Sequence, residues 1–361
     1  MMNRLLFIIF ISYIFTNTHS QRCGFYDNII SPSTRIRPTL DTSIFSPSGH
    51  FQIHFDTLGN DAPLLDDTNN NNIPDYVEEV GIIADSTRKV LVDLMGYYSE
   101  PDDDDGIYDI YIEDRGPGSY GFTSFDDQYQ LGASYMLIDD EYEEGDYHIP
   151  GINTMRLTVA HEFFHAIQRS YRLPLGDHDF FLEMSSMWFE DIIVPNGNDY
   201  VHPGDSDKPC DGWAEKLLCN PTADFNNTGN GYELALFGHY LSSFIDEKGI
   251  NDVKQSTIIR EIWEDYSSHC INTDNQCSDI IESIKVAGSV ISGNLILIRN
   301  NNQLPNIQAS KIKVAVIRGD NSGFPISTHH LTTANILPIN TAQGITICII
   351  ACIPNMLPHA P

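Results

Sequence analysis

The segment 157–168 constrains the fold more than any other part of this sequence. It carries the pattern His161-Glu162-x-x-His165 among apolar residues that recur with helical spacing. Four residues advance a helix by about 400°, so both imidazoles lie on one face and can bind one ion. A metal site of this kind also needs a ligand from elsewhere in the chain. We therefore expect a second element to pack closely against this helix.

Two sequence patterns supply the third ligand of such a site. In one pattern Gly and His stand three and six residues after the second His, but this chain has Gln168 and Tyr171 at those positions. In the other pattern a Glu follows on the next helix, and here Glu183 follows His165 with 17 residues between them. The first class is excluded and the second is favoured.

Glu190 is the competing candidate on the same predicted helix, residues 179–194, which also offers Ser185 and Ser186 for close helix approach. It lies seven residues after Glu183, almost on the same face, yet about 10.5 Å further along the axis. One ion with bonds of about 2 Å cannot ordinarily bind both. We expect Glu183 to be the ligand and Glu190 to be a hydrogen-bond acceptor for a ligand His or a surface acid.

The pattern also assigns chemistry to Glu162, which lies one step round the helix from His161. From there its carboxylate can reach water in the open position of a zinc ion, so Glu162 is the expected general base. Hydrolysis further needs a donor for the developing oxyanion, and the candidates are Tyr232, His239 and Tyr240. We assign Tyr232, with core packing as the alternative for each of the three.

A second ion site is predicted in the segment 67–78, where oxygen-bearing residues follow the spacing of a calcium-binding EF-hand loop. Asn72 replaces the usual Gly at the sixth position, and Asn tolerates the left-handed conformation required there. The alternative is an Asx-rich turn without an ion. The expected ligands are Asp67, Asn69, Asn71, Ile73 through its carbonyl, Asp75 and Glu78.

Two further acidic runs, residues 102–105 and 139–146, are expected to be solvated loops in which calcium is an alternative. The chain carries a formal net charge of −30, so nucleic acids and anionic membranes are unsuitable partners. Residues 1–20 have the basic start, short apolar run and small residues of a secretory signal, which predicts a secreted protein without membrane insertion. Its seven cysteines then suggest disulfides, with Cys210/Cys219 and Cys270/Cys277 as pairs by proximity.

The pattern along the chain predicts five parts. After the signal at 1–20 come an extended lead-in at 21–45, an N-terminal α/β lobe at 46–152, a helical zinc-binding lobe at 153–285 and an accessory β module at 286–361. Order is expected to begin near Gly49. Strands are predicted at 50–55, 108–113 and 133–139, and helices at 74–95, 153–172, 179–194, 231–247 and 253–266.

Several of these segments together resemble a family of exported bacterial proteins classed as zinc metallopeptidases. The resemblance covers about residues 46–265 and rests on SGHFQIHF at 48–55, NIPDYVE at 72–78, YDIYI at 108–112, SYMLID at 134–139 and the helix pair. It implies a zincin-like fold related to the thermolysin and zinc-aminopeptidase clan. By motif match it also implies His161, His165 and Glu183 as the zinc ligands.

Zinc aminopeptidases of that clan carry a Gly-Ala-Met-Glu-Asn strand whose Glu binds the substrate amine. The comparable stretch here, 132–136, reads GASYM, which favours an endopeptidase unless Asp139 or Asp140 substitutes for that Glu. The strand at 134–138 could pair with an extended peptide. We therefore expect an α+β, zincin-like peptidase acting on peptides or proteins, and the alternative is a secreted calcium- and zinc-binding adhesion or binding protein without turnover.

Overall fold

The computed structural model describes residues 37–102, 104–125, 132–143, 147–173, 179–201, 212–219, 225, 229–269, 280–281, 283–284 and 287. The predicted signal segment lies outside these residues, as does the accessory β module apart from Ala287. The same holds for Cys210, Cys270 and Cys277, while Cys219 is disulfide-bonded. No helix within the described ranges is long and apolar enough to cross a membrane.

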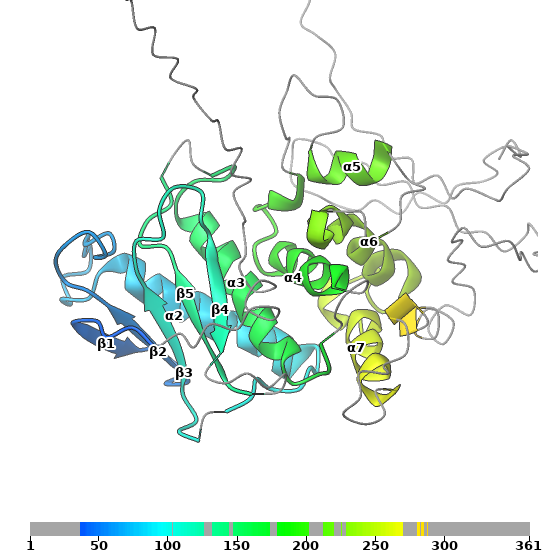
Figure 1. The fold of residues 1–361 in the computed structure, drawn as a ribbon, viewed down its shortest axis with the longest axis horizontal. Helices are drawn as coiled ribbons and strands as arrows, with labels where there is room; N and C mark the ends of the chain where they lie inside the picture. The colour runs from blue at the N-terminus through cyan, green and yellow to red at the C-terminus, as the bar shows by residue number, and fades with distance from the viewer. Residues whose placement is uncertain are drawn as a thin grey trace, which may run out of the picture.

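An α+β architecture is built around a five-stranded mixed sheet in the order β1-β2-β3-β5-β4 (Figure 1). The three middle strands β2, β3 and β5 run parallel, and the outer strands β1 and β4 pair antiparallel with their neighbours. The strand bounds are Thr42–Phe45 for β1, Phe51–Phe55 for β2, Tyr108–Ile112 for β3, Gly121–Phe125 for β4 and Ser134–Ile138 for β5. Strands β3 and β5 are buried along their whole length, as their central positions require.

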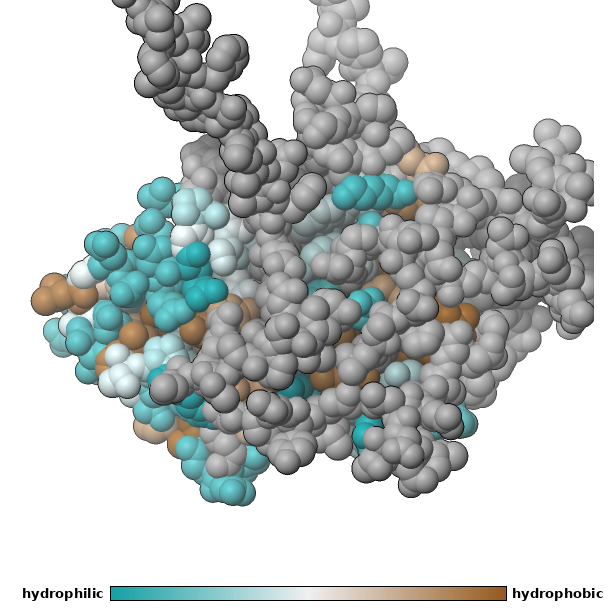
Figure 2. All heavy atoms as spheres, viewed as in Figure 1, coloured by the Kyte–Doolittle hydropathy of each residue, from teal (hydrophilic) through white to brown (hydrophobic). Residues whose placement is uncertain are grey.

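Two helices cover one face of the sheet: α2 (Asp75–Arg88), continued by a π-helix at Lys89–Leu94, and α3 (Ile152–Gln168). The other face carries a small separate cluster of Tyr111, Phe122, Tyr135 and Leu137, against which Leu40 packs. Hydrophilic residues predominate on the part of the described surface over the sheet that faces the viewer in Figure 2.

The remaining helices gather on the other side of α3, away from the sheet (Figure 1). They are α4 (Phe180–Ile193), α5 (Trp213–Cys219), α6 (Ala235–Tyr240) and α7 (Ile258–His269), with 3₁₀ turns at Asp199–Val201, Gly229–Leu234 and Val253–Gln255 and a π-helix at Leu241–Ile245. Helix α3 therefore packs against the sheet on one side and against α4 on the other. One continuous apolar core runs through both groups of elements, so the position of α3 at its centre is fixed from two sides.

The structure confirms most predicted elements with shifted ends and corrects several details. Strand β1 lies inside the predicted extended lead-in, because Ser46 and Gly49 close a turn that pairs it with β2. Strand β4 and helix α5 were not predicted. The predicted helix 253–266 is interrupted before α7, where Ser256 and Thr257 donate hydrogen bonds to the carboxylate of Asp246.

The prediction that the strand at 134–138 offers its main chain to a peptide is wrong. Strand β5 pairs with β4 along its whole length and with β3 at residues 136–138, so it is an inner strand rather than an edge of the sheet. Strand β4 is the edge of the sheet next to α3 within the described residues. Any strand pairing at this end of the sheet would involve β4.

Candidate metal centre

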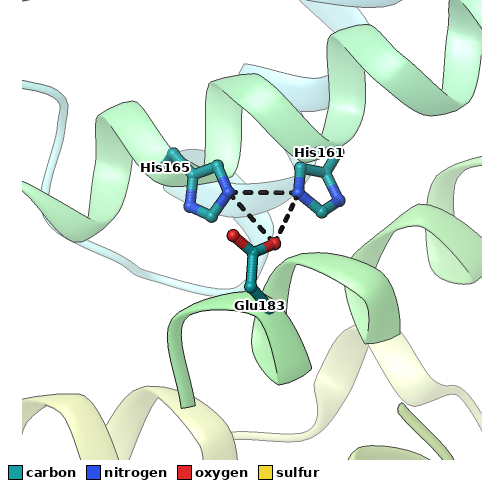
Figure 3. A group of neighbouring side chains, drawn as sticks. All are labelled: His161, His165 and Glu183. Atoms are coloured by element: carbon teal, nitrogen blue, oxygen red, sulfur yellow. Dashed lines mark hydrogen bonds and ion pairs between the residues drawn. The ribbon is translucent and has the colours of Figure 1, made fainter. Parts of the chain in front are cut away.

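Helix α3 presents His161 and His165 side by side (Figure 3). Their Nε2 atoms lie 3.0 Å apart, and the exposed fractions of the two residues are 2% and 0%. This follows from the four-residue spacing on one helical face. The sequence supplied the pair, and burial of α3 between the sheet and α4 removes it from bulk water.

Helix α4 delivers the third group, Glu183, from its first turn. The Glu183 Oε2 atom lies 3.0 Å from the Nε2 atom of His161 and 3.5 Å from that of His165 (Figure 3). Glu183 is 2% exposed. The structure thus brings the three predicted ligands together as a buried group that could hold a metal ion.

The outer nitrogen of each imidazole has its own hydrogen-bond acceptor. Glu190 Oε1 lies 2.5 Å from His161 Nδ1, which confirms the predicted contact between Glu190 and a ligand His. Gln168 Oε1 lies 2.8 Å from His165 Nδ1. Sequence reasoning missed the role of Gln168, although its place three residues after His165 on the same helix put it within reach.

The orientation of the Gln168 amide is fixed by α4. Its Nε2 atom donates to the main-chain carbonyl of Leu182 at 2.9 Å and to the hydroxyls of Ser185 and Ser186, each at 3.1 Å. A carbonyl can only accept, so the amide oxygen must face His165 and that imidazole donates from Nδ1. The Nε2 atom of His165 then keeps its lone pair for the centre of the group.

This donor set fits a cation. Two imidazole nitrogens and a carboxylate oxygen converge, and without a cation only a proton shared among them could satisfy these three acceptors in the buried site. Two metal–nitrogen bonds of about 2.0–2.1 Å at a tetrahedral angle separate the nitrogens by about 3.3 Å, close to the separations found here. The residues could therefore hold a metal ion.

The electrostatics of the group also favour a bound cation. Burial acts to lower the pKa of His161, but hydrogen bonds to Glu183 and Glu190 outweigh it and raise that pKa to about 10. Burial acts to raise the pKa of Glu183, but the neighbouring His165 and His161 lower it to about 2. The carboxylates thus favour positive charge at the centre, and a bound cation would take the place of the proton.

Glu162 points from α3 toward the sheet. Its Oε2 atom lies 3.0 Å from the hydroxyl oxygen of Thr123 on β4, and the residue is 1% exposed. It is therefore a buried carboxylate next in sequence to a candidate ligand. Thr123 is a further residue that sequence reasoning missed, because the strand that carries it was not recognised.

Among the three candidate oxyanion donors, Tyr232 is the one whose ring lies against His161, with 6.3 Å between ring centroids. The ring also stacks on Trp213 at 5.2 Å. Gly231 allows this approach: its φ is +104°, and a Cβ there would fall 2.1 Å from the carbonyl oxygen of Phe180. Tyr232 is thus held over the centre by the start of α4 and by α5.

The other two candidates have different surroundings. His239 lies 3.5 Å from a carboxylate oxygen of Asp191 and packs against the ring of Tyr200. Burial lowers the pKa of His239 to about 4, which disfavours its cationic form. Tyr240 stacks on Phe237 and Phe244. These contacts are those of packed core residues.

The predicted calcium segment forms a tight loop before α2. The carboxylate of Asp67 accepts the main-chain N–H groups of Asn71 and Asn72 at 3.1 and 2.8 Å. The side-chain amides of Asn69 and Asn71 donate to the carboxylate of Glu78 at 2.9 and 2.7 Å. The loop thus gathers Asp67, Asn69, Asn71 and Glu78, and a cation there would require the two amides to present oxygen instead of nitrogen.

Two details of this loop bear on the prediction. Asn72 has φ of +68°, as expected for the sixth position. Asp75 is turned toward Thr68, whose N–H and hydroxyl it accepts, and Ile73 donates its N–H to the side-chain oxygen of Asn71. The side chain of Asp75, one of the predicted calcium ligands, is therefore engaged by Thr68.

The expectation that residues 139–146 form a solvated loop is wrong for Asp139 and Asp140, which are 4% and 7% exposed. They follow directly on β5, and together with Asp114 they form a second acidic group. Asp139 accepts hydrogen bonds from the hydroxyl of Tyr147 and the main-chain N–H of Arg115, each at 2.7 Å. Burial raises the pKa of Asp139 to about 6 and that of Asp140 to about 7, the latter helped by neighbouring carboxylates.

Comparison with protein-family models finds no match for this chain, and a search of curated proteins finds no sequence that matches it.

Proposed function

We propose that this chain is a secreted zinc-dependent peptidase with a zincin-like catalytic region, acting as an endopeptidase on extended peptides. The observation that carries the proposal is the buried group of His161, His165 and Glu183, built from two helices. The adjoining Glu162 adds the acid–base group that hydrolysis needs. Two His and one Glu form a donor set typical of catalytic zinc, with a position left open.

A zinc ion in this group would supply a Lewis acid for the scissile carbonyl and lower the pKa of a water molecule. The residues of the chain supply the rest. Glu162 accepts a proton from the attacking water and returns it to the leaving amine, so its charge is restored at the end of each turnover. Tyr232, held beside His161, donates from its hydroxyl to the developing oxyanion.

Glu190 and Gln168 act on the imidazoles rather than on the substrate. By accepting from the outer nitrogens of His161 and His165 they hold both rings in the orientation that directs Nε2 inward. Both acceptors are buried, so the rings cannot turn without losing hydrogen bonds that no water replaces.

Endopeptidase action is favoured by what lies beside the group. The edge of β4 adjoins α3, and an extended peptide can pair with such an edge along its main chain. Asp139, which could have replaced the amine-binding Glu of an aminopeptidase, is engaged by Tyr147 and Arg115. We further propose that calcium bound at the loop 67–78 stabilises the start of α2.

The proposal is tested by zinc analysis of the dialysed full-length protein combined with digestion of a mixed peptide library, with and without a chelator. We expect about one zinc per chain, internal cleavage of peptides, and loss of cleavage with the chelator that zinc restores. Zinc without any cleavage would favour the binding protein without turnover. Absence of retained zinc would reject the metal site itself.

A further inference from the structure

Thr123 makes the closest described polar contacts of Glu162. Its Oγ1 atom lies 3.0 Å from Glu162 Oε2 and 2.7 Å from the main-chain oxygen of the same residue. Thr123 is fully buried and Glu162 is 1% exposed. A hydroxyl with two acceptors of one residue within reach can turn its hydrogen toward either of them.

The fold sets this contact through the packing of β4 on α3. Thr123 is in register with Met136 of β5, so its position along the strand is fixed by the sheet. Gly121, two residues earlier on the same face, lacks the Cβ atom that would fall 2.8 Å from Thr158 of α3. This close approach is what lets a side chain as short as that of Thr123 reach the helix.

We propose that Thr123 is a positioning residue whose hydroxyl holds the carboxylate of Glu162 in place, an inference that rests on the proposed function. When Glu162 is ionised, the Thr123 hydroxyl donates to Oε2. With Oε2 held in this way, Oε1 is the oxygen left to take the proton from water and return it to the leaving amine.

The positioning of Glu162 should therefore depend on the hydroxyl of Thr123 rather than on the volume of its side chain. Thr123→Val keeps the branched shape and removes the hydroxyl, whereas Thr123→Ser keeps the hydroxyl and removes a methyl group. We expect Thr123→Val to lower kcat by about 10- to 100-fold with KM unchanged, the range for losing a hydrogen bond to a charged group. Thr123→Ser should restore most of kcat.

Thr87→Val on α2 is a matched control, since Thr87 is fully buried and its hydroxyl makes no hydrogen bond within the described residues. Zinc content and thermal midpoint are measured for every variant, and both should stay close to the parent's for Thr123→Val. In a Glu162→Gln background, Thr123→Val should lower kcat no further, because Thr123 acts through Glu162.

Unchanged kcat in Thr123→Val would overturn the inference, and equal losses in Thr123→Val and Thr123→Ser would reduce the role to packing. A parent without hydrolysis would reject the proposed function instead. Crystal structures of the two variants then test the positioning alone. The Glu162 carboxyl group should stay on the hydroxyl in Thr123→Ser and move away in Thr123→Val, and an unmoved carboxyl group in the latter contradicts the inference.

Discussion

Glu190 Oε1 lies 2.5 Å from His161 Nδ1, and Glu183 Oε2, from the first turn of the same helix α4, lies 3.0 Å from Nε2 of the same ring. Helix α4 thus contacts both ring nitrogens of His161 through two different carboxylates. The two residues are seven positions apart, which separates their Cα atoms by about 10.5 Å along the helix, and their side chains converge on opposite nitrogens of the ring. Because Glu183 contacts the nitrogen inside the candidate metal group and Glu190 contacts the outer nitrogen, the two residues should affect metal binding differently.

If the group binds zinc as proposed, Glu183→Ala should abolish zinc retention almost completely, since it removes one of the three proposed ligands. Glu190→Ala should weaken zinc affinity by about 10- to 100-fold, the effect usual for an outer hydrogen-bond partner. Zinc stoichiometry after dialysis against graded chelator concentrations measures both. Full zinc retention in Glu183→Ala together with loss in Glu190→Ala would reverse the assignment.

Gln168→Glu should destabilise the protein by about 1–3 kcal/mol, because a carboxylate oxygen would face the Leu182 carbonyl that now accepts from the amide. Urea unfolding of the zinc-free protein measures the change. Gln255→Glu, at an exposed position, makes the same substitution away from α4 and should stay within about 0.5 kcal/mol of the parent. Equal stability of the two variants would contradict the inferred amide orientation.

On the proposed mechanism, Glu162→Gln should fold and retain zinc while losing at least about 100-fold in kcat, because the substitution removes the proposed base and leaves every proposed ligand in place. Zinc analysis and the rate of peptide cleavage are measured on the same preparation. Glu261→Gln on α7 serves as the control for loss of one carboxylate elsewhere. A Glu162→Gln enzyme as active as its parent would exclude the proposed mechanism.

Calcium should raise the thermal midpoint through the loop 67–78, by an amount equivalent to about 2.7 kcal/mol at a concentration 100 times its Kd. The double variant Asp67→Ala, Glu78→Ala should lose this increment, because those two carboxylates lie at the ends of the loop. Asp102→Ala, Asp105→Ala removes the same charge from another exposed loop. If the Asp67→Ala, Glu78→Ala variant gains as much thermal stability from calcium as the parent does, the loop is an Asx-rich turn that binds no calcium.

Asp140→Asn should stabilise the protein at alkaline pH and not at acid pH. Burial, with help from Asp139, Glu141 and Asp114, raises the pKa of Asp140 to about 7, so ionisation is less favourable in the folded state than in the unfolded state. The destabilisation is absent below an unfolded pKa of about 3.9, grows toward pH 7 and is complete above it. Urea unfolding in chelator at pH 4 and pH 8 should show a gain of roughly 1 kcal/mol only at pH 8, and an equal gain at both would remove the electrostatic explanation.

The unforeseen elements show where local pattern fails. Strand β4 reads Gly-Phe-Thr-Ser-Phe, a short run with turn-forming residues, and it becomes a strand because β5 offers it an edge to pair with. The short strand β1 similarly depends on a turn that folds it back on β2. Pairing between segments supplies the hydrogen bonds in both cases, and a window along the sequence does not contain the partner.

The sequence by itself determined that His161 and His165 lie on one helical face, because four-residue spacing puts them there, and it named Glu183 on the next helix as the candidate third ligand. The first relation follows from helix geometry, which is local, whereas the contact of Glu183 with the two imidazoles depends on how α4 packs on α3. Only the tertiary structure decided that Gln168 holds His165 and that Thr123 reaches Glu162. Those contacts depend on how closely α4 and β4 pack on α3, and packing is set by the whole core rather than by any one segment.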